Sequence, residues 1–366
     1  MKAKVQVIKF LKTDLGFVIC AFLIWRILLF AIGWAANLSF DYVSLPHPFN
    51  EGNFLSVWAN WDGGHYINIA YNGYIGPNLT AFFPMYPMLL RFVSLIVQYS
   101  VISGLIVSGA AIVMAGYWLI KLVKLDFSEK IARNSFILLL LFPTAVFLGA
   151  VYSESLFLMT TIGAIYFARK KNWWAVLFLG FAAGLTRNLG AFLVFPLLYE
   201  YFMQFRFKIR WPILAVGSPG FAIVSYMVYL WAQFGDPLLF LHQQVNWGRK
   251  IVVNVFWRFQ EAFNSALNSI EKIEFICVVF AVILIILMIK KLRPSYIIWS
   301  IILLLIPVMQ NTWISMNRFV LVIFPAFIIL SFFGDRYKYL NHILYILFGA
   351  GLIYYTALFV NLGWAG

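Results

Sequence analysis

The sequence predicts an all-α, polytopic membrane protein with about 11 transmembrane helices, and three observations lead to this fold class. The 366 residues are 63% hydrophobic and 11% charged, and their mean hydropathy is +0.89, whereas soluble domains are about half apolar and a quarter charged. Apolar runs recur along the chain, and a spanning helix needs about 20 mostly apolar residues. Lys and Arg cluster between these runs, as in cytoplasmic loops, so the net charge of +14 does not indicate nucleic acid.

The first apolar run, residues 15–36, follows a basic segment with four lysines in residues 1–12. It is too long for the apolar core of a cleaved signal peptide, so we expect a retained signal anchor with a cytoplasmic N-terminus. From that start, 19 of the 27 Lys and Arg residues fall inside, seven fall outside and Arg26 lies within the first span. The predicted spans are residues 14–36, 101–120, 134–151, 154–168, 173–186, 189–204, 212–233, 273–289, 295–310, 319–333 and 340–360.

Two segments on the predicted outer side are long, residues 37–100 and 234–271, and loops of this length usually carry function. Residues 81–97 within the first are apolar enough to span, but they contain two prolines and Arg91, and counting them would place two basic clusters outside. We therefore predict an interfacial helix that lies along the outer face. No repeat or soluble domain interrupts the pattern, so residues 1–366 are predicted to form one membrane domain.

The densest cluster of polar and aromatic residues is Trp61-Asp62-Gly63-Gly64-His65-Tyr66, in the first outer segment. In a helix, residues three and four apart are neighbours, so Asp62, His65 and Tyr66 would share one face. A carboxylate beside the membrane can accept the proton of a hydroxyl that attacks an anomeric carbon. We interpret Asp62 as a catalytic base and His65 and Tyr66 as substrate contacts. The alternative for Asp62 is a helix cap or a solvated loop charge.

Two arginines, Arg187 and Arg318, lie at the outer ends of apolar segments. Arginines near a membrane core are costly, which indicates a functional partner, and the guanidinium fork suits a phosphate. A phosphate leaving group departs already ionised, so cations and one base would suffice for an inverting transfer. Arg91 and the pair Arg249-Lys250 are weaker candidates, because interfacial basic residues often meet lipid headgroups.

Three further polar residues complete the candidate substrate contacts. Glu154 lies at a short outer turn, where it could cap a helix, support the site or bind a metal ion. Asp236 and His242 lie in the second outer segment and would meet the acceptor or water. The structural alternative is that Glu154 or Asp236 forms internal ion pairs with the two arginines. Outer carboxylates could hold a divalent ion, although no spacing demands one. No organic cofactor is implied, and the isolated Cys20 and Cys277 support neither a disulfide nor a metal site.

The stretch from Trp61 to Pro87 reads W-D-x-x-H-Y-x-x-I-A-x-x-G-Y followed by A-F-F-P-x-Y-P. This pattern resembles the PIG-V type mannosyltransferases of glycosylphosphatidylinositol assembly and their prokaryotic relatives. Asn188 stands where the family pattern leads us to expect proline, and Phe319 where tyrosine is usual. Further segments resemble the family in the same order over nearly the whole chain: Phe142-Pro143-Thr144, Tyr152 to Phe157, Leu185-Thr186-Arg187, Phe234 to Pro237, and Arg318 before Phe324-Pro325.

The resemblance implies a GT-C glycosyltransferase fold, with interfacial helices in the first outer loop and the catalytic aspartate at Asp62. It also implies an inverting transfer of a mannose-like sugar from a polyprenyl phosphate. The acceptor would be a hydroxyl of a lipid, glycan or protein. The active site would face the outside of the plasma membrane in a prokaryote, or the endoplasmic reticulum lumen in a eukaryote.

Two alternatives to this function stay open at the level of the sequence. A transporter or flippase of lipid-linked sugars would also use many spans and buried arginines, although transporters often show repeated halves and none is visible here. The same chemistry with another hexose or a pentose is the second alternative, because pocket shape selects among hydroxyl configurations.

Overall fold

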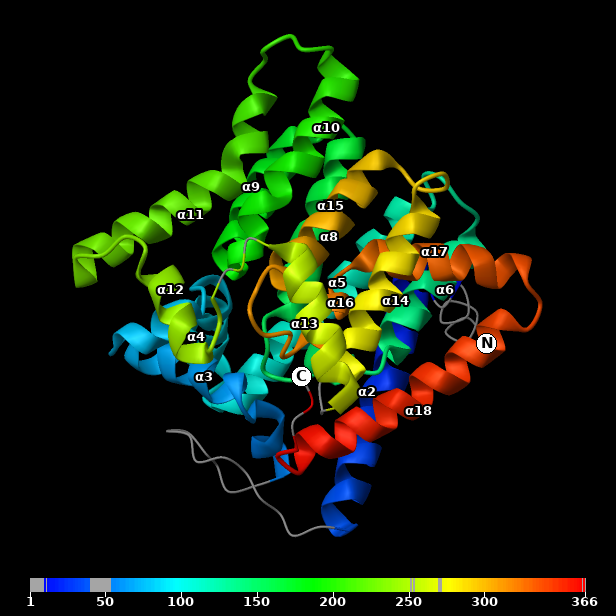
Figure 1. The fold of residues 1–366 in the computed structure, drawn as a ribbon, viewed down its shortest axis with the longest axis horizontal. Helices are drawn as coiled ribbons and strands as arrows, with labels where there is room; N and C mark the ends of the chain where they lie inside the picture. The colour runs from blue at the N-terminus through cyan, green and yellow to red at the C-terminus, as the bar shows by residue number, and fades with distance from the viewer. Residues whose placement is uncertain are drawn as a thin grey trace.

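The computed structural model describes residues 10, 12–39, 54–250, 252, 254–268, 272–363 and 365. This part of the chain is helical and contains no β-strand, which confirms the predicted all-α class (Figure 1). Four of its helices are long and apolar enough to cross a membrane, so the protein is an integral membrane protein. These are α2 (Asp14–Ser39), α5 (Ser100–Val123), α11 (Pro212–Phe234) and α18 (Leu340–Val360). The count of 11 spans stays a prediction.

Every predicted span contains helix, but the helices are interrupted in three places. Residues 134–151 do not form one helix, because α6 (Glu129–Leu141) ends before Pro143, and proline restricts the preceding residue and lacks an N–H. The short α7 (Val146–Gly149) and a turn lead into α8 (Glu154–Arg169).

The second interruption lies between α9 (Trp173–Thr186) and α10 (Val194–Phe205), where the 3₁₀ turn η3 (Asn188–Leu193) intervenes. The third separates α16 (Met316–Leu321) from α17 (Phe324–Arg336), which has a proline in its first turn. Backbone without regular helix is tolerated at membrane depth only where it is buried in protein or lines a cavity. The three interruptions therefore indicate where a site should be sought.

The described part of the first outer segment consists of short helices. They are η1 (Phe54–Ala59), α3 (Asp62–Asn72), η2 (Pro77–Ala81) and α4 (Met85–Val97). Large apolar side chains on α4 are exposed, among them Phe92 at 65% and Ile96 at 78%. This face suits the predicted contact with lipid at the interface, and the orientation of α4 in the bilayer stays a prediction. Residues 40–53 of the segment lie outside the described residues.

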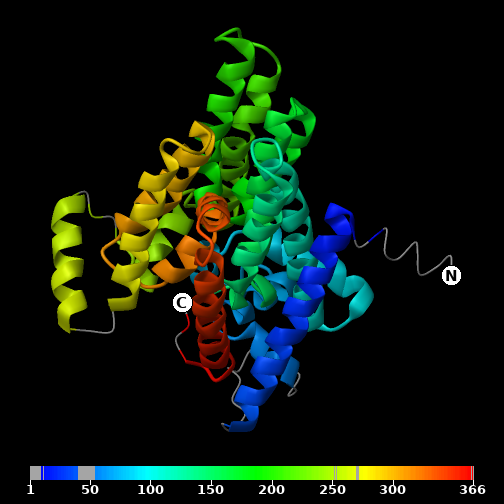
Figure 2. The same cartoon turned by 90° about the vertical axis from the view of Figure 1, so that its right-hand side faces the viewer.

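The second outer segment contains α12 (Leu239–His242), η4 (Gln243–Trp247) and α13 (Val255–Asn268). It leads into α14 (Lys272–Met288) and α15 (Pro294–Val308). The N-terminal α2 and the C-terminal α18 pack against each other although they come from opposite ends of the chain (Figure 2).

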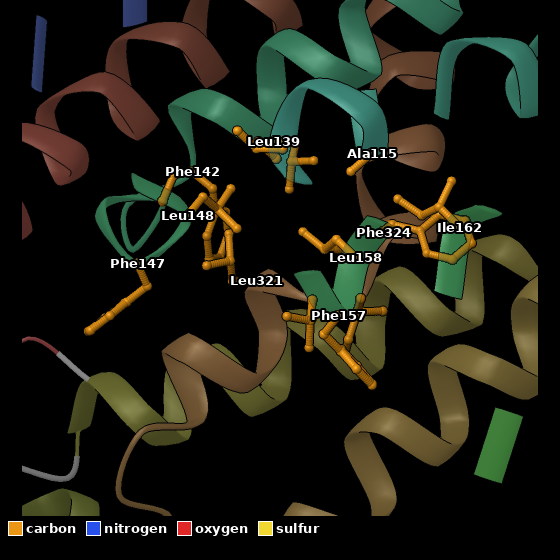
Figure 3. Packing of buried hydrophobic residues seen from close by; sticks show 14 of the residues in the cluster. Ala115, Leu139, Phe142, Phe147, Leu148, Phe157, Leu158, Ile162, Leu321 and Phe324 are labelled. Atoms are coloured by element: carbon orange, nitrogen blue, oxygen red, sulfur yellow. The ribbon is translucent and has the colours of Figure 1, made fainter. Parts of the chain in front are cut away.

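The core joins α5, α6, α8 and α17 through large apolar side chains, including Leu139, Phe157 and Phe324 (Figure 3). Small residues allow the helices to approach closely. A Cβ atom on Gly116 of α5 would lie 2.4 Å from the ring of Phe136 on α6. Close contact at small residues is the usual way in which membrane helices associate, because lipid supplies no hydrophobic drive between them. This rigid core holds the interrupted ends of α6, α8 and α17 in place.

Candidate active site

A cavity of about 680 Å³ lies where α3 meets the three interruptions. Its polar wall contains Asp62, His65, Arg187, Arg249 and Arg318, and its apolar wall comes from α3, η2, α15 and the loop before α16. Five of the sequence-predicted residues therefore line one cavity although they come from distant parts of the chain: Asp62, His65, Tyr66, Arg187 and Arg318. A pocket of several hundred Å³ with a few convergent polar groups is the expected form of a small-molecule site.

Asp62 is the first residue of α3, and the chain enters this helix through a strained turn. Trp61 has φ of 58° and ψ of −123°, in a region that L-residues rarely adopt. The phenol of Tyr152 holds the turn, because it accepts a hydrogen bond from the Asp62 N–H at 3.2 Å and donates one to the Asn60 carbonyl at 3.0 Å. A carboxylate in the first turn of a helix is favoured by the helix dipole. The turn therefore directs Asp62 into the cavity.

Four predicted residues form one chain of ion pairs. Arg318 donates from Nη1 to Asp62 Oδ2 at 2.6 Å, and it also pairs through Nε with Glu154 Oε1. Arg187 donates from Nη1 to the same Glu154 oxygen at 2.6 Å. Glu154 is fully buried at the start of α8. The structural alternative of internal pairing with Glu154 is thus confirmed for both arginines, and two cations offset the cost of burying this acid.

The second oxygen of Asp62 is available to a substrate. Oδ2 accepts the Arg318 hydrogen bond, whereas Oδ1 has no hydrogen-bond partner among the residues that the structure describes. The side chain is 24% exposed and lines the cavity. An acceptor hydroxyl could therefore donate its hydrogen bond to Oδ1 while Arg318 fixes the plane of the carboxylate.

His65 and Tyr66 lie on the cavity wall beside Asp62, as the helical spacing predicts. Tyr66 is buried, and its hydroxyl shares a hydrogen bond of 2.8 Å with Ser153 Oγ, so it positions the turn before α8. The imidazole of His65 lies 4.9 Å from the ring of Phe82, centroid to centroid. Burial lowers the pKa of His65, and the charge of Asp62 opposes that shift only in part. The ring is therefore neutral at pH 7.

Replacing His65 by glutamine tests whether its role is hydrogen bonding or titration. We expect His65→Gln to lower kcat/KM of the transfer reaction by about tenfold, the effect of one hydrogen bond. The pH profile between pH 7 and 8 should keep its shape, because the lowered pKa leaves the native ring mostly uncharged over that range. Initial rates at limiting donor give kcat/KM, and the same rates measured across the pH range give the pH profile. Loss of an inflection in the variant's profile would show that His65 titrates during turnover.

The structure does not bring Arg91, Asp236 and His242 to the cavity. Arg91 is exposed on α4, with its guanidinium 5.0 Å from the ring of Tyr71. Asp236 and His242 pair with each other at 2.6 Å, and this contact lowers the pKa of Asp236. The side chain of His242 is 61% exposed. Their assignment as substrate contacts therefore has no support from the cavity.

Several cavity residues had no assigned role in the sequence. Asn68, Asn188, Gln244 and Gln310 line the polar wall, and Arg249, which seemed a weaker candidate than Arg187, lies there too. Neutral amides carry no charge signal, and an arginine in a long loop resembles a headgroup contact. The packing of η4 and α12 of the second outer segment against η2 of the first brings Gln244 and Arg249 to this wall.

Gly190 determines the position of Arg187, because η3 returns very close to α9. A Cβ atom at Gly190 would lie 2.0 Å from the carbonyl oxygen of Ala183. We expect Gly190→Ala to destabilise the protein by about 2 kcal/mol or more, which lowers the melting temperature in detergent and the transfer rate. Gly349→Ala is the control, since no atom lies within 4 Å of that Cβ and alanine favours helix. Equal melting temperatures for the two variants would contradict the expected clash.

The described residues contain no group of three or more His, Cys, Asp or Glu side chains that could hold a metal ion. Asp62 and Glu154, the two acids of the site, each accept from arginine. Cys20 and Cys277 are free thiols.

The fold and the site define an integral membrane protein with a cavity that is lined by one aspartate, Asp62, and three arginines. The chain matches the family described as Mannosyltransferase (PIG-V) over residues 7–211, which is more than half of its length, and it belongs to that family. This match includes Asp62, Glu154 and Arg187, whereas Arg249 and Arg318 lie beyond it.

Two curated relatives align with part of the chain. GPI alpha-1,6-mannosyltransferase 2 of Homo sapiens is 32% identical over 146 residues, which are 37% of this chain and 30% of that protein. GPI mannosyltransferase 2 of Schizosaccharomyces pombe is 29% identical over 144 residues, 38% of this chain and 31% of that protein. The chain therefore aligns with about a third of the length of each relative.

A solved crystal structure is also similar to this chain. It is the oligosaccharyltransferase of Archaeoglobus fulgidus tethered with an acceptor peptide, with a TM-score of 0.47 and 12% identity. The alignment covers 98% of this chain and 56% of that chain. This similarity is too distant to carry a functional conclusion.

Proposed function

We propose that this protein transfers a mannose-like sugar from a polyprenyl-phosphate donor to a hydroxyl acceptor, with inversion at the anomeric carbon. One observation carries the proposal. Asp62 presents a free carboxylate oxygen to a cavity whose polar wall also contains three arginines, Arg187, Arg249 and Arg318. This arrangement suits a reaction in which a hydroxyl loses a proton at one side and a phosphate leaves at the other. Membership of the mannosyltransferase family supports the choice of sugar.

The reaction would take place in one displacement. The acceptor hydroxyl gives its proton to Asp62 Oδ1 as its oxygen bonds to the anomeric carbon. The bond from that carbon to the phosphate oxygen breaks, and the electron pair leaves with the phosphate. Arginine side chains stabilise the charge that develops there. One attack from the face opposite the phosphate inverts the configuration.

The apolar wall of the cavity would receive the isoprenoid chain. Phe82, Phe83, Ile306 and Ile314 line it, and the donor would enter sideways from the outer leaflet. This requires residues 54–81 to face the non-cytoplasmic side, in agreement with the distribution of Lys and Arg in the sequence. The acceptor, a glycolipid, a glycan or a protein, would approach from water.

A transfer assay tests the chemistry. Purified protein is incubated with polyprenyl-phosphate-mannose, its glucose analogue or a nucleotide-linked mannose, together with octyl mannoside and a panel of glycolipid and peptide acceptors. We expect transfer from the polyprenyl-phosphate-mannose alone, and NMR of the product should show inversion. Movement of intact donor across vesicles without any transfer would instead favour a flippase.

Labelling tests the orientation. In a variant with Cys20 and Cys277 replaced by alanine, Ile75→Cys and Lys290→Cys place single thiols at two exposed positions. An impermeant maleimide added to intact cells or sealed vesicles should label position 75 from the non-cytoplasmic side and position 290 from the cytoplasmic side. The reverse pattern would contradict the proposed orientation.

A further inference from the structure

The charged groups of the site do not cancel. The cavity and the buried Glu154 behind it bring together two acids and three arginines, Arg187, Arg249 and Arg318. Both acids are already paired, Asp62 with Arg318 and Glu154 with both Arg318 and Arg187. The site therefore carries a net charge of about +1, and Arg249 is the group that supplies it.

Arg249 is held over the site by the backbone of the second outer segment. It follows Gly248, whose φ of 70° ends η4, and its N–H donates to the Gln244 carbonyl at 3.0 Å. Its guanidinium lies 5.1 Å from the centre of the Phe319 ring, and that of Arg187 lies 5.8 Å from the same ring. In the part of the chain that the structure describes, no carboxylate pairs with Arg249.

The surroundings of Arg249 leave it charged but poorly compensated. Burial lowers its pKa to about 10, and the positive charge of Arg318 contributes to the shift. The side chain is still protonated at neutral pH. A half-buried cation beside two others is costly without a counter-ion, and a bound anion would remove that cost.

Arg318 is fixed in place while one of its partners can lose its charge. Its guanidinium is anchored by buried Glu154 and lies 4.6 Å from the ring of Tyr152 and 5.1 Å from that of Phe147. Its bond to Asp62 is the contact that faces the cavity. When Asp62 accepts a proton, the charge of Arg318 loses this partner but stays where it is.

We propose that Arg249 binds the phosphate of the lipid-linked donor. Arg318 compensates the charge of Asp62 before the sugar is transferred, and it compensates the added charge of the leaving phosphate once Asp62 has accepted the proton. This inference rests on the proposed function. Before transfer, the donor phosphodiester carries one negative charge, which the net +1 of the site balances. Proton transfer to Asp62 raises the charge of the site to about +2. The same step converts the phosphodiester into a phosphate monoester with about two negative charges at neutral pH, so the balance is kept throughout.

Binding of a short prenyl phosphate tests the role of Arg249. The probes are farnesyl phosphate, a dianion, and its methyl ester, a monoanion, with the dissociation constant measured on purified protein in detergent. We expect Arg249→Gln to weaken both by about tenfold to a hundredfold, the effect of one charge-assisted hydrogen bond, and Arg249→Lys to recover part of the loss. Lys250→Gln is the matched control, because this neighbouring side chain is exposed and does not line the cavity. Equal losses for Arg249→Gln and Lys250→Gln, or unchanged binding by Arg249→Gln, would overturn the assignment.

Asp62→Asn tests whether phosphate binding strengthens when the negative charge of Asp62 is lost. The variant gives the site the net charge that is expected after proton transfer. We expect this variant to bind farnesyl phosphate about tenfold more tightly than the native protein. Its methyl ester should gain only about threefold, because the added electrostatic energy is proportional to the ligand's charge. Equal or weaker binding of farnesyl phosphate by Asp62→Asn would overturn the coupling between Asp62 and Arg318.

The same measurements separate this inference from the proposed function. Tight binding of prenyl phosphate that depends on Arg249, without sugar transfer to any acceptor, would support the anion site and contradict the proposed transferase function. Sugar transfer by native protein together with undiminished phosphate binding by Arg249→Gln would support the transferase function and contradict the role of Arg249.

Discussion

Asp62→Asn is expected to lower kcat of mannosyl transfer by about 10² to 10⁴-fold, the range that general bases contribute. Asparagine keeps the size of the side chain and can still accept the Arg318 hydrogen bond, but its amide cannot take a proton at neutral pH. KM for the donor should change far less than kcat, because the donor contacts are expected to be arginines. Steady-state rates with radiolabelled donor measure both constants.

Asp335→Asn is the matched control for this experiment. Asp335 is also an aspartate paired with one basic residue, Lys130, at 2.6 Å, but it lies away from the cavity. It should retain nearly native kcat. If Asp62→Asn keeps more than a tenth of native kcat while Asp335→Asn is unchanged, another group takes the proton, and the assignment of the base is wrong.

The first part of the site could be predicted because it depends on local geometry. Asp62, His65 and Tyr66 follow helical spacing, and all three line the cavity. Arg187 and Arg318 could be predicted as site residues because an arginine near a bilayer core is costly unless it has a functional partner. Ion pairs between these arginines and Glu154 were one alternative that the sequence allowed, but the sequence does not distinguish them from pairs with another acid. Those contacts join residues 33 and 164 positions apart, so no periodic pattern contains them.

Proline explains why the interrupted helices were harder to predict than the helices themselves. Pro143 and Pro325 lie at helix breaks, whereas Pro219 and Pro307 lie inside α11 and α15. Both outcomes are normal in membranes, because neighbouring helices and polar side chains can satisfy the freed backbone groups. Which proline breaks a helix depends on the tertiary contacts at that depth. The same limit applies to Arg249, whose place over Phe319 depends on how the second outer segment folds.

Glu154→Gln is expected to have the largest effect on stability, about 3 kcal/mol or more, because it leaves two arginines with one acid fewer to compensate them. Gln can reproduce the shape of the native side chain, in which Oε1 accepts both arginines and Oε2 has no partner among the described residues. The loss would therefore come from charge and not from packing. Thermal unfolding in detergent should show a lower melting temperature.

Glu200→Gln separates stability from function. Glu200 is also fully buried and pairs with one arginine, Arg293, through Nε at 2.6 Å and Nη2 at 2.9 Å. Both variants should lose stability, since each removes a buried carboxylate that compensates a partly buried guanidinium. Only Glu154→Gln should also lose activity per folded molecule, by about tenfold or more, because Arg318 loses the anchor that holds it against Asp62. If the two variants keep the same activity per folded molecule, Glu154 serves stability alone, and Arg318 is positioned by its aromatic neighbours.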